Sequence, residues 1–210
     1  MRFFVLTFAS MALAAQTARQ HHPPRDAAEY AKILEDPKRD SWQLPQMVVT
    51  QLGLKPEEVV ADIGAGTGYF ARRFSKHAGK VYAVDIDEKL LAISRKDAPA
   101  NLVTVLAAPD DPKLPAGGVD TIFFCDVLHH VENRTAYYRK LEKALKPGGR
   151  VVIVDFHKKP LPIGPPESMK LAEAEVIAEF KAAGFRLSRT FDGLPYQYFL
   201  EFRATREAAR

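Results

Sequence analysis

The 210-residue sequence predicts an α/β fold, an open and doubly wound sheet of mainly parallel strands with helices on both faces. An apolar run over residues 59–63 enters a turn with glycines at alternate positions, and a helical pattern starts at once after this turn. A second apolar run then ends on a carboxylate, Asp85. This order of strand, glycine turn, helix and strand is typical of sheets that bind a ligand across the carboxyl ends of their strands.

The glycine turn and Asp85 predict a site for a nucleoside-containing ligand. A side chain in the turn would hold the ligand away from the backbone, and the turn needs φ/ψ values that other residues avoid. Asp85 comes 23 positions after Asp62, at the end of the second strand, where its carboxylate can accept hydrogen bonds from both hydroxyls of a ribose. The glycine spacing is G-x-G-x-G rather than the G-x-G-x-x-G of dinucleotide binders. Asp62 precedes it, and a carboxylate there would repel a pyrophosphate but suits an ammonium group.

The other elements follow from apolar runs, helical spacing and turn residues. Further strands are predicted at residues 102–107, 118–126, 185–191 and 196–203, and residues 146–155 are predicted to hold a helix stop, a tight turn and a fifth strand. Helices are predicted at residues 26–36, 40–53, 133–146 and from about 167 to 184. Asp26 with Glu29 resembles a capping box, Pro45 suits a first helical turn, and Gly53 suits a helix end.

The first 25 residues predict export. Residues 1–15 have a short basic start, an apolar stretch and Ala12-Leu13-Ala14 as a cleavage site, which is the pattern of a secretory signal peptide. Residues 16–25 read as a linker and residues 26–210 as the functional domain. The protein is therefore expected in the periplasm or outside the cell, or in the cytoplasm if the signal is not used. Cys125 has no second cysteine to pair with, so the redox compartment stays open.

The composition is that of one ordinary globular domain. It is 47% hydrophobic and 27% charged, which excludes disorder and multiple membrane spans. The net charge of +4 is scattered, with no basic stripe interleaved with aromatic residues, so no nucleic-acid partner is expected. After signal removal we expect no stable membrane span, and the oligomeric state stays open. Two adjacent histidines before two prolines, at 21–24, have poor ligand geometry, and no metal is expected.

Taken in order, these motifs resemble the class I S-adenosylmethionine-dependent methyltransferases, whose first motif is commonly written [D/E]-x-G-x-G-x-G. The resemblance extends to a D-x-x-x-L-P element from Asp110 to Pro115, to Leu128-His129-His130-Val131, and to L-K-P-G-G at 145–149. It covers about residues 42–202. It implies a Rossmann-like, seven-stranded sheet in which an antiparallel seventh strand lies between the fifth and sixth, and S-adenosylmethionine as cofactor.

The resemblance also implies roles for particular residues. Residues 26–55 would form lid helices over cofactor and substrate, and Asp110 would reach the adenine amino group, with Asp111 as a competitor. The predicted cofactor-binding residues are Asp62, Gly64, Ala65, Gly66, Thr67, Gly68, Asp85, Ile86, Asp110 and Asp126.

The predicted catalytic residues are His130, His129 and Asp126. Methyl transfer from a sulfonium mainly requires alignment and exclusion of water, and a general base helps when the acceptor is a hydroxyl or phenol. An imidazole titrates near neutrality, which suits this role. His130 is favoured because an α-helical turn would place it on the same side as Asp126, with His129 packing or capping. Asp126 would hold the cofactor's amino group or the acceptor.

The acceptor is expected to be a small, apolar or aromatic molecule. The motif [D/N]-P-P-[Y/F/W], which is typical of enzymes that methylate amino groups of bases, is replaced by Cys125-Asp126-Val127-Leu128. The sequence motif at 128–131 resembles that of the branch that includes quinone-biosynthesis C-methyltransferases. The sequence has no Cys cluster, which argues against the arsenic-methylating branch. Two alternatives stay open, a nicotinamide-dependent oxidoreductase on the same sheet and a non-catalytic protein that binds S-adenosylmethionine.

Overall fold

The computed structural model describes residues 26–96 and 98–205. The predicted signal peptide at 1–15 and linker at 16–25 lie outside the described residues, and both stay predictions. Within the two described ranges, no helix has the length and apolar character needed to cross a membrane.

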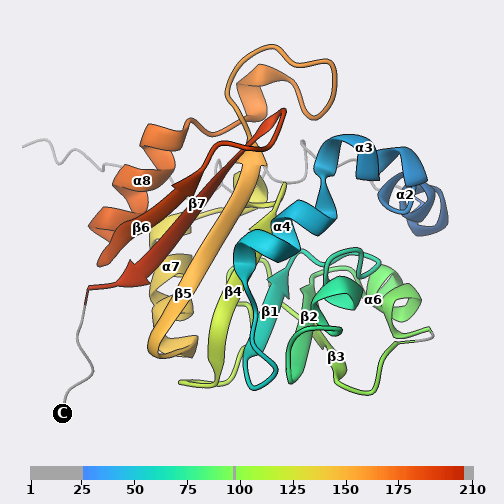
Figure 1. Cartoon of the computed structure of the whole chain (residues 1–210), viewed down its shortest axis with the longest axis horizontal. Coiled ribbons are helices and arrows are strands. Elements are labelled where there is room, and N and C mark those ends of the chain that lie inside the picture. Colours follow the sequence, from blue (N-terminus) through green and yellow to red (C-terminus); the bar gives the residue numbers. More distant parts are fainter. Residues whose placement is uncertain (1–25, 97, 206–210) are drawn as a thin grey trace, which may run out of the picture.

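A seven-stranded sheet forms the centre of the molecule (Figure 1). Its strands are β1 (Val59–Ile63), β2 (Lys80–Asp85), β3 (Leu102–Leu106), β4 (Val119–Cys125), β5 (Leu145–Phe156), β6 (Phe185–Phe191) and β7 (Gln197–Ala204). Their order in space is β3-β2-β1-β4-β5-β7-β6. Strands β1 to β5 pair in parallel, whereas β7 runs antiparallel to both of its neighbours. The predicted fold class is confirmed, including the antiparallel seventh strand.

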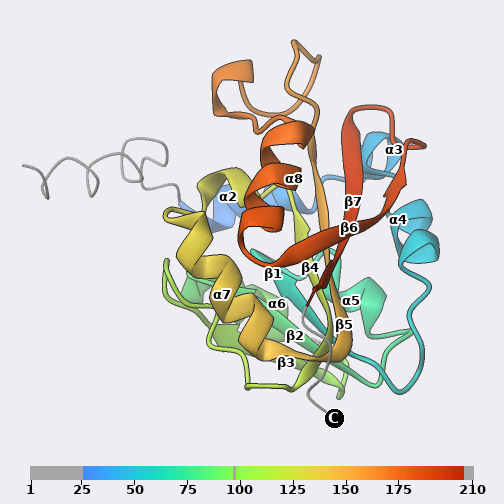
Figure 2. The same ribbon diagram turned by 90° about the vertical axis from the view of Figure 1, so that its left-hand side faces the viewer.

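Helices cover both faces of this sheet, as the sequence predicts. Figure 2 shows α7 (Arg134–Ala144) and α8 (Glu173–Ala182) on one side, with α4 (Pro45–Leu52) and α5 (Ala71–Phe74) on the other. Successive side chains of a strand point to opposite faces. In β5, Val151 and Ile153 accordingly join the core under α7 and α8, and Val152 and Val154 join the core under α4 and α5.

Between residue 26 and the sheet, the structure has four short helical segments: α2 (Ala27–Leu34), the 3₁₀ turn η2 (Pro37–Arg39), α3 (Asp40–Gln43) and α4. Asp26 caps α2 by accepting from the backbone N–H groups of Ala28 and Glu29. Pro45 begins α4, and Gly53 ends it in the left-handed conformation. Figure 1 shows α2 and α3 at the end of the sheet toward which β1 and β5 point. Helix α4 joins the hydrophobic core, where Val48 and Leu52 are buried, and α3 contributes the buried polar side chain of Gln43.

Three predicted helix boundaries are wrong. The helix after the glycine turn does not start at once, because irregular turns continue to Phe70 and α5 spans only Ala71–Phe74. Helix α7 ends at Ala144, since the chain turns extended at Leu145 and pairs with β4 as the start of β5. The helix expected from about residue 167 begins at Glu173. Before it lies the 3₁₀ turn η4 (Glu167–Met169), followed by Lys170 in an extended conformation.

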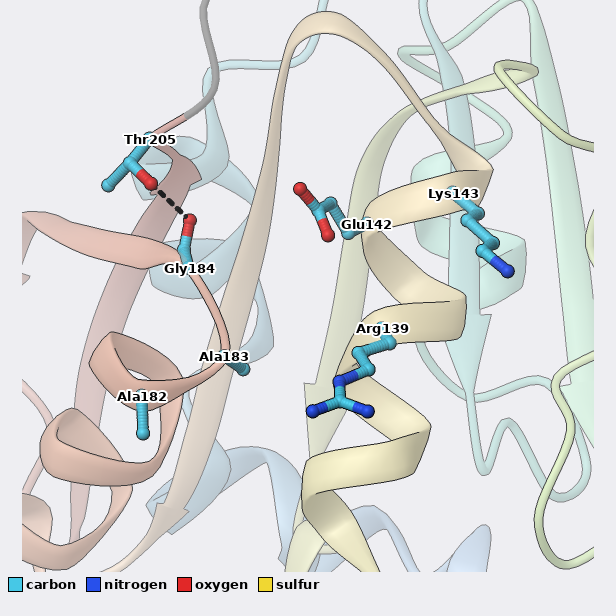
Figure 3. A pocket seen from close by; sticks show the side chains of 7 residues that line it. All are labelled: Arg139, Glu142, Lys143, Ala182, Ala183, Gly184 and Thr205. Carbon is cyan, nitrogen blue, oxygen red and sulfur yellow. Dashed lines mark hydrogen bonds between the residues drawn. The ribbon is translucent and has the colours of Figure 1, made fainter.

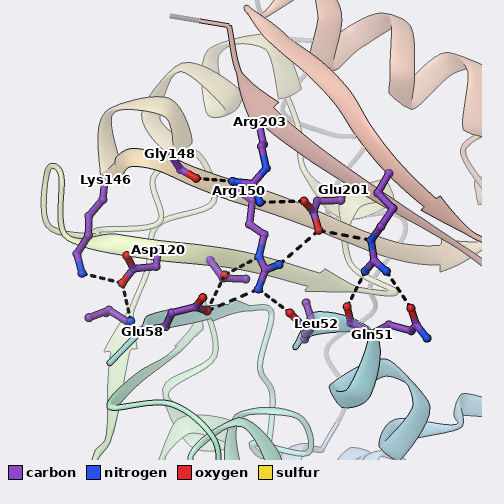
Figure 4. A network of polar contacts seen from close by, with 12 residues as sticks. Gln51, Leu52, Glu58, Asp120, Lys146, Gly148, Arg150, Glu201 and Arg203 are labelled. Atoms are coloured by element: carbon purple, nitrogen blue, oxygen red, sulfur yellow. Dashed lines mark hydrogen bonds and ion pairs between the residues drawn. The ribbon is translucent and has the colours of Figure 1, made fainter. Parts of the chain in front are cut away.

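A polar network joins α4 to the ends of the strands far from the glycine turn (Figure 4). The guanidinium of Arg150 donates to the carbonyl of Leu52 at 2.6 Å and to the Thr121 hydroxyl at 2.9 Å. It also pairs with the carboxylates of Glu58 and Glu201. The contact with Leu52 satisfies a carbonyl in the last turn of α4, which would otherwise lack a partner. We assign this network to the anchoring of the pre-sheet helices.

Candidate functional site

The glycine turn leaves β1 at the carboxyl edge of the sheet and lies against the segment that follows β4. Gly64 has a φ of +70°, a conformation that residues with a Cβ rarely adopt. A Cβ built on Gly64 would lie 2.2 Å from Cγ2 of Val127. The N–H groups of Gly64 and Ala65 donate to the carbonyl of Val84, at 2.8 and 3.0 Å. The turn is therefore held between the ends of β2 and β4.

Asp62 is buried beside this turn with one oxygen unpaired. Its side chain lies in β1, the residue is only 3% exposed, and its Oδ2 has no hydrogen-bond partner. Burial raises the pKa of Asp62 to about 8, while a backbone hydrogen bond from Ala71 and the charge of Arg39 oppose the rise. An unpaired buried carboxylate oxygen costs free energy, and this cost is removed if a cationic ligand binds there.

Asp85 ends β2 and accepts two backbone hydrogen bonds. The N–H of Gly66 donates to its Oδ2 at 2.7 Å, and the N–H of Asp87 donates to its Oδ1 at 2.9 Å. Burial raises the pKa of Asp85, and these two bonds oppose the rise. Beside it lie two apolar side chains that are exposed to solvent, Ile86 at 61% and Leu106 at 53%. Leu106 is the β3 partner of Asp85, so the two strand ends present an apolar surface next to a carboxylate.

The segment before α4 reaches over the glycine turn. A Cβ on Gly66 would lie 2.9 Å from Cδ1 of Leu34, and the buried Thr67 hydroxyl donates to Oε1 of Glu35. Glu35 also pairs with Arg72 at 2.6 Å. Residues 34–40 therefore lie over the turn. The lid role expected for residues 26–55 stays a prediction.

Asp110 lies on the loop after β3, and its side chain is 80% exposed. The ammonium of Lys140 in α7 lies 3.4 Å from its Oδ2 and donates to its carbonyl oxygen at 2.6 Å. The neighbouring Asp111 accepts from the N–H of Lys113 and also pairs with Lys140. The structure thus places both carboxylates against Lys140, and the expected role of Asp110 toward the cofactor stays a prediction.

Asp126 follows β4 in a strained and partly buried conformation. Its φ is +56°, in the left-handed region, and its N–H donates to the carbonyl of Val154 at 2.9 Å. The side-chain amide of Gln197 donates to its Oδ1 at 2.6 Å. Burial raises the pKa of Asp126 to about 7, and the neighbouring charge of Asp155 adds to the rise. Backbone strain of this kind concentrates at functional sites.

The two histidines lie in the 3₁₀ turn η3 (Leu128–His130), so the α-helical register expected between Asp126 and His130 is wrong. The Nδ1 of His129 lies 3.2 Å from Oδ2 of Asp155, and the two side chains are 3% and 0% exposed. The ring of His130 lies against that of His129, with 3.9 Å between the ring centres. The structure therefore pairs His129 with the carboxylate of Asp155. Which histidine acts as a base stays a prediction.

The sequence analysis missed four side chains of this site. Asp155 ends β5 at the same edge of the sheet as Asp126, and that position was a usable signal. Arg39 and Gln43 lie in η2 and α3, and Gln197 starts β7. No local pattern marks these three, because they meet Asp126 only through the tertiary fold.

Two cavities of the described chain differ in their distance from this site. One of about 550 Å³ lies between α7 and the end of α8, lined by Arg139, Glu142, Lys143, Ala182, Ala183, Gly184 and Thr205 (Figure 3). None of these residues belongs to the predicted site. A second, of about 400 Å³, is lined by Glu35, Arg72, Arg73, Lys76 and Pro99 and so borders the contact between residues 34–40 and the glycine turn.

Comparison with known proteins agrees with this geometry. A family model described as a methyltransferase domain matches residues 61–153, from β1 through most of β5. The crystal structure of a SAM dependent methyltransferase from Aquifex aeolicus superimposes with a TM-score of 0.78 at 26% identity, covering 85% of this chain and 98% of that one. The matched part of the chain, residues 61–153, is a methyltransferase domain of the class I S-adenosylmethionine-dependent type.

Curated relatives of this methyltransferase chain have different names. A ubiquinone/menaquinone biosynthesis C-methyltransferase from Cupriavidus taiwanensis is 33% identical over 129 residues, which cover 57% of this chain and 52% of that protein. Phosphoethanolamine N-methyltransferase 1 from Arabidopsis thaliana is 29% identical over 146 residues, covering 66% of this chain and 27% of that protein. The chain thus spans about half the length of the first relative and about a quarter of the second.

The residues of this methyltransferase fit the cofactor of its family. The unpaired oxygen of Asp62 suits the ammonium of the methionine moiety, and Asp85 beside the exposed Ile86 and Leu106 suits a ribose followed by an apolar base. The close approach of Gly64 to Val127 leaves no room for a side chain in the turn. Together these observations support S-adenosylmethionine as the cofactor.

The raised pKa of Asp62 predicts that cofactor binding tightens as the pH rises. Below a pKa of about 8 the neutral carboxyl dominates, whereas pairing with an ammonium requires the carboxylate. Binding must then release a proton, and the affinity for S-adenosylhomocysteine should rise about tenfold for each pH unit up to that pKa. Calorimetry across this range measures the slope. The Asp62→Asn variant should bind weakly and lose the slope, and an unchanged slope in this variant would assign the proton to another group.

Asp85→Ala should weaken cofactor binding about 10- to 150-fold. A hydrogen bond to a charged group is worth about 1.5–3 kcal/mol, and the variant also releases the N–H of Gly66. Asp87→Ala is the matched control, because Asp87 caps α6 (Glu88–Arg95) and its loss affects stability rather than the ribose. Calorimetry with S-adenosylhomocysteine compares the two variants. Equal affinity in Asp85→Ala and wild type would remove Asp85 from the ribose site.

Proposed function

We propose that this chain transfers the methyl group of S-adenosylmethionine to a small-molecule acceptor that gives up a proton, with His129 as the general base. The observation that carries the proposal is the buried pair of His129 and Asp155, at the carboxyl ends of the central strands. A carboxylate can only accept hydrogen bonds, so the proton of a neutral His129 lies on Nδ1 and its Nε2 has a lone pair for an acceptor.

Each part of the site has its own task in this reaction. The bound cofactor supplies an activated methyl group on a sulfonium. Asp62 and Asp85 hold its charged and ribose ends, and the glycine turn keeps the backbone close to it. Residues 34–40 exclude water by covering the turn, and Asp155 fixes the tautomer and orientation of His129. Such alignment can supply roughly 7–11 kcal/mol of the barrier.

The acceptor class follows from the base. A base that takes up a proton at Nε2 assists methyl acceptors that lose a proton, such as a hydroxyl, a phenol or an acidic carbon. The name of the Cupriavidus relative describes methylation of carbon, in agreement with this class, while that of the Arabidopsis relative describes methylation of nitrogen. The absence of [D/N]-P-P-[Y/F/W] after β4 argues against an amino group of a base as the target. We therefore favour quinols and phenols.

Binding and turnover experiments separate this function from its alternatives. Calorimetry with S-adenosylmethionine and S-adenosylhomocysteine should show binding, whereas NADH should leave the intrinsic fluorescence unchanged. A panel of quinols, phenols and thiols should then reveal an acceptor by release of S-adenosylhomocysteine. Binding without release from any of these would favour the non-catalytic alternative, and binding of NADH alone would favour an oxidoreductase.

A further inference from the structure

A chain of three hydrogen-bonded side chains connects the pre-sheet helices to Asp126. Nε and Nη2 of Arg39 donate to Oε1 of Gln43, at 3.3 and 3.2 Å. The amide nitrogen of Gln43 donates to Oε1 of Gln197 at 2.7 Å, and that of Gln197 donates to Oδ1 of Asp126 at 2.6 Å. Gln43 and Gln197 are completely buried. Three segments far apart in the sequence therefore meet in one polar line through the core.

The direction of this line is set at its first residue. A guanidinium has five N–H donors and no acceptor, so the side chain of Gln43 must turn its oxygen toward Arg39. Its NH₂ group then faces Gln197, which must accept with its own oxygen and turn its NH₂ group toward Asp126. Each amide thus passes on the same orientation. At the far end Asp126 meets a donor, which stabilises a carboxylate more than a neutral carboxyl.

We propose that Arg39, Gln43 and Gln197 are positioning residues that orient the carboxylate of Asp126 and favour its ionised form. This inference rests on the proposed function and on the role that the sequence predicts for Asp126, contact with the cofactor or the acceptor. It adds to that function a specific task for Arg39, which lies in the segment 34–40 that covers the turn, and for Gln43, which follows this segment. The segment that covers the glycine turn also sets the charge next to the reacting groups.

The groups around Asp126 favour its neutral and its ionised forms about equally, so one hydrogen bond is enough to change which form dominates. Its burial and the carboxylate of Asp155 in β5 favour the neutral form. Arg39, the bond from Gln197 and the imidazole of His129 favour the ionised form. The thiol of Cys125 lies 3.6 Å from its other oxygen, Oδ2. These opposing influences bring the pKa of Asp126 to about 7, close to neutrality. The hydrogen bonds from Arg39 through Gln43 and Gln197, here called the relay, can therefore shift the ratio of ionised to neutral Asp126 in either direction.

A titration of the free protein tests the relay directly. Aspartate carboxyl groups are labelled with ¹³C, and the Asp126 resonance is identified by its loss in Asp126→Asn. In Gln43→Leu and Gln197→Leu the pKa of Asp126 should rise by about one to two units, the equivalent of one lost hydrogen bond to a charged group. Lys181→Met, which removes an exposed charge on α8, should leave it unchanged.

Two further pairs of variants separate the effect of amide orientation from the effect of side-chain packing. In Gln43→Glu the carboxylate accepts at both ends, so Gln197 must donate to it and turn its own oxygen toward Asp126. This variant keeps the volume of the side chain and should raise the pKa of Asp126 more than Gln43→Leu does. Arg39→Lys keeps a donor without an acceptor and should stay near wild type, whereas Arg39→Met should raise the pKa.

An Asp126 pKa that matches wild type in both Gln197→Leu and the isosteric Gln43→Glu, with the folds intact by circular dichroism, would overturn the relay. The titration needs neither cofactor nor acceptor. Its failure is therefore distinct from a failure of the proposed function, which would appear as absent binding of S-adenosylhomocysteine by the wild-type protein.

Discussion

Gly64→Ala is expected to abolish binding of S-adenosylhomocysteine and to lower the melting temperature of the protein. The added Cβ would lie 2.2 Å from Cγ2 and 2.9 Å from Cβ of Val127. Rotation of the valine side chain does not relieve a contact with its Cβ, so the backbone after β4 must move. That segment includes Asp126 and η3, and the displacement would disturb the cofactor side and the histidines together.

Gly148→Ala is the matched control for this prediction. Gly148 also has a positive φ, +78°, but a Cβ built there meets no atom within 4 Å. It therefore costs only the left-handed strain, about 1–2 kcal/mol of unfolding free energy, with the affinity for S-adenosylhomocysteine unchanged. Calorimetry and thermal unfolding of both variants measure the difference. Equal losses in the two would show that conformational strain, not the contact with Val127, makes glycine necessary at position 64.

Most of the fold could be predicted because its signals are local. Each parallel strand is a short apolar run that ends at a turn, and the chain alternates strands with helical patterns, which leaves few topologies open. Glycines at alternate positions and Asp85 located the ligand edge of the sheet. The place of β7 between β5 and β6 came from the resemblance to a family, since two terminal strands alone do not specify which of them pairs with β5.

The remaining features depend on contacts between distant residues. The prediction of His130 depended on an α-helical turn between Asp126 and His130. The left-handed conformation of Asp126 and the 3₁₀ turn η3 place the two histidines differently relative to Asp126. Gln43 and Gln197 are separated by 154 positions and carry no motif. Their role depends on burial and hydrogen-bond direction, which residue spacing does not encode. The exposed position of Asp110 against Lys140 likewise depends on how α7 packs.

Replacing His129 should have the largest effect on turnover. Once an acceptor is identified, His129→Ala is expected to lower turnover about 10²-fold or more, the usual scale for the loss of a general base, with nearly unchanged affinity for S-adenosylhomocysteine. Asp155→Asn should cause a comparable loss, because the amide donates to Nδ1 and moves the imidazole proton to Nε2, where it blocks the lone pair. Nitrogen-15 NMR of the free protein reports this change of tautomer without any acceptor.

Two other histidines make the prediction specific. His157 also pairs with a carboxylate, Glu173 at 2.7 Å, but it is 30% exposed and lies beyond the end of β5. His157→Ala should leave turnover close to wild type, which controls for the loss of a paired imidazole. His130→Ala should cause a smaller loss than His129→Ala, since His130 packs on the ring of His129 and supports its position. A large loss in His130→Ala with turnover retained in His129→Ala would make His130 the base. It would leave the pair of His129 and Asp155 a structural role, that of holding η3 against β5.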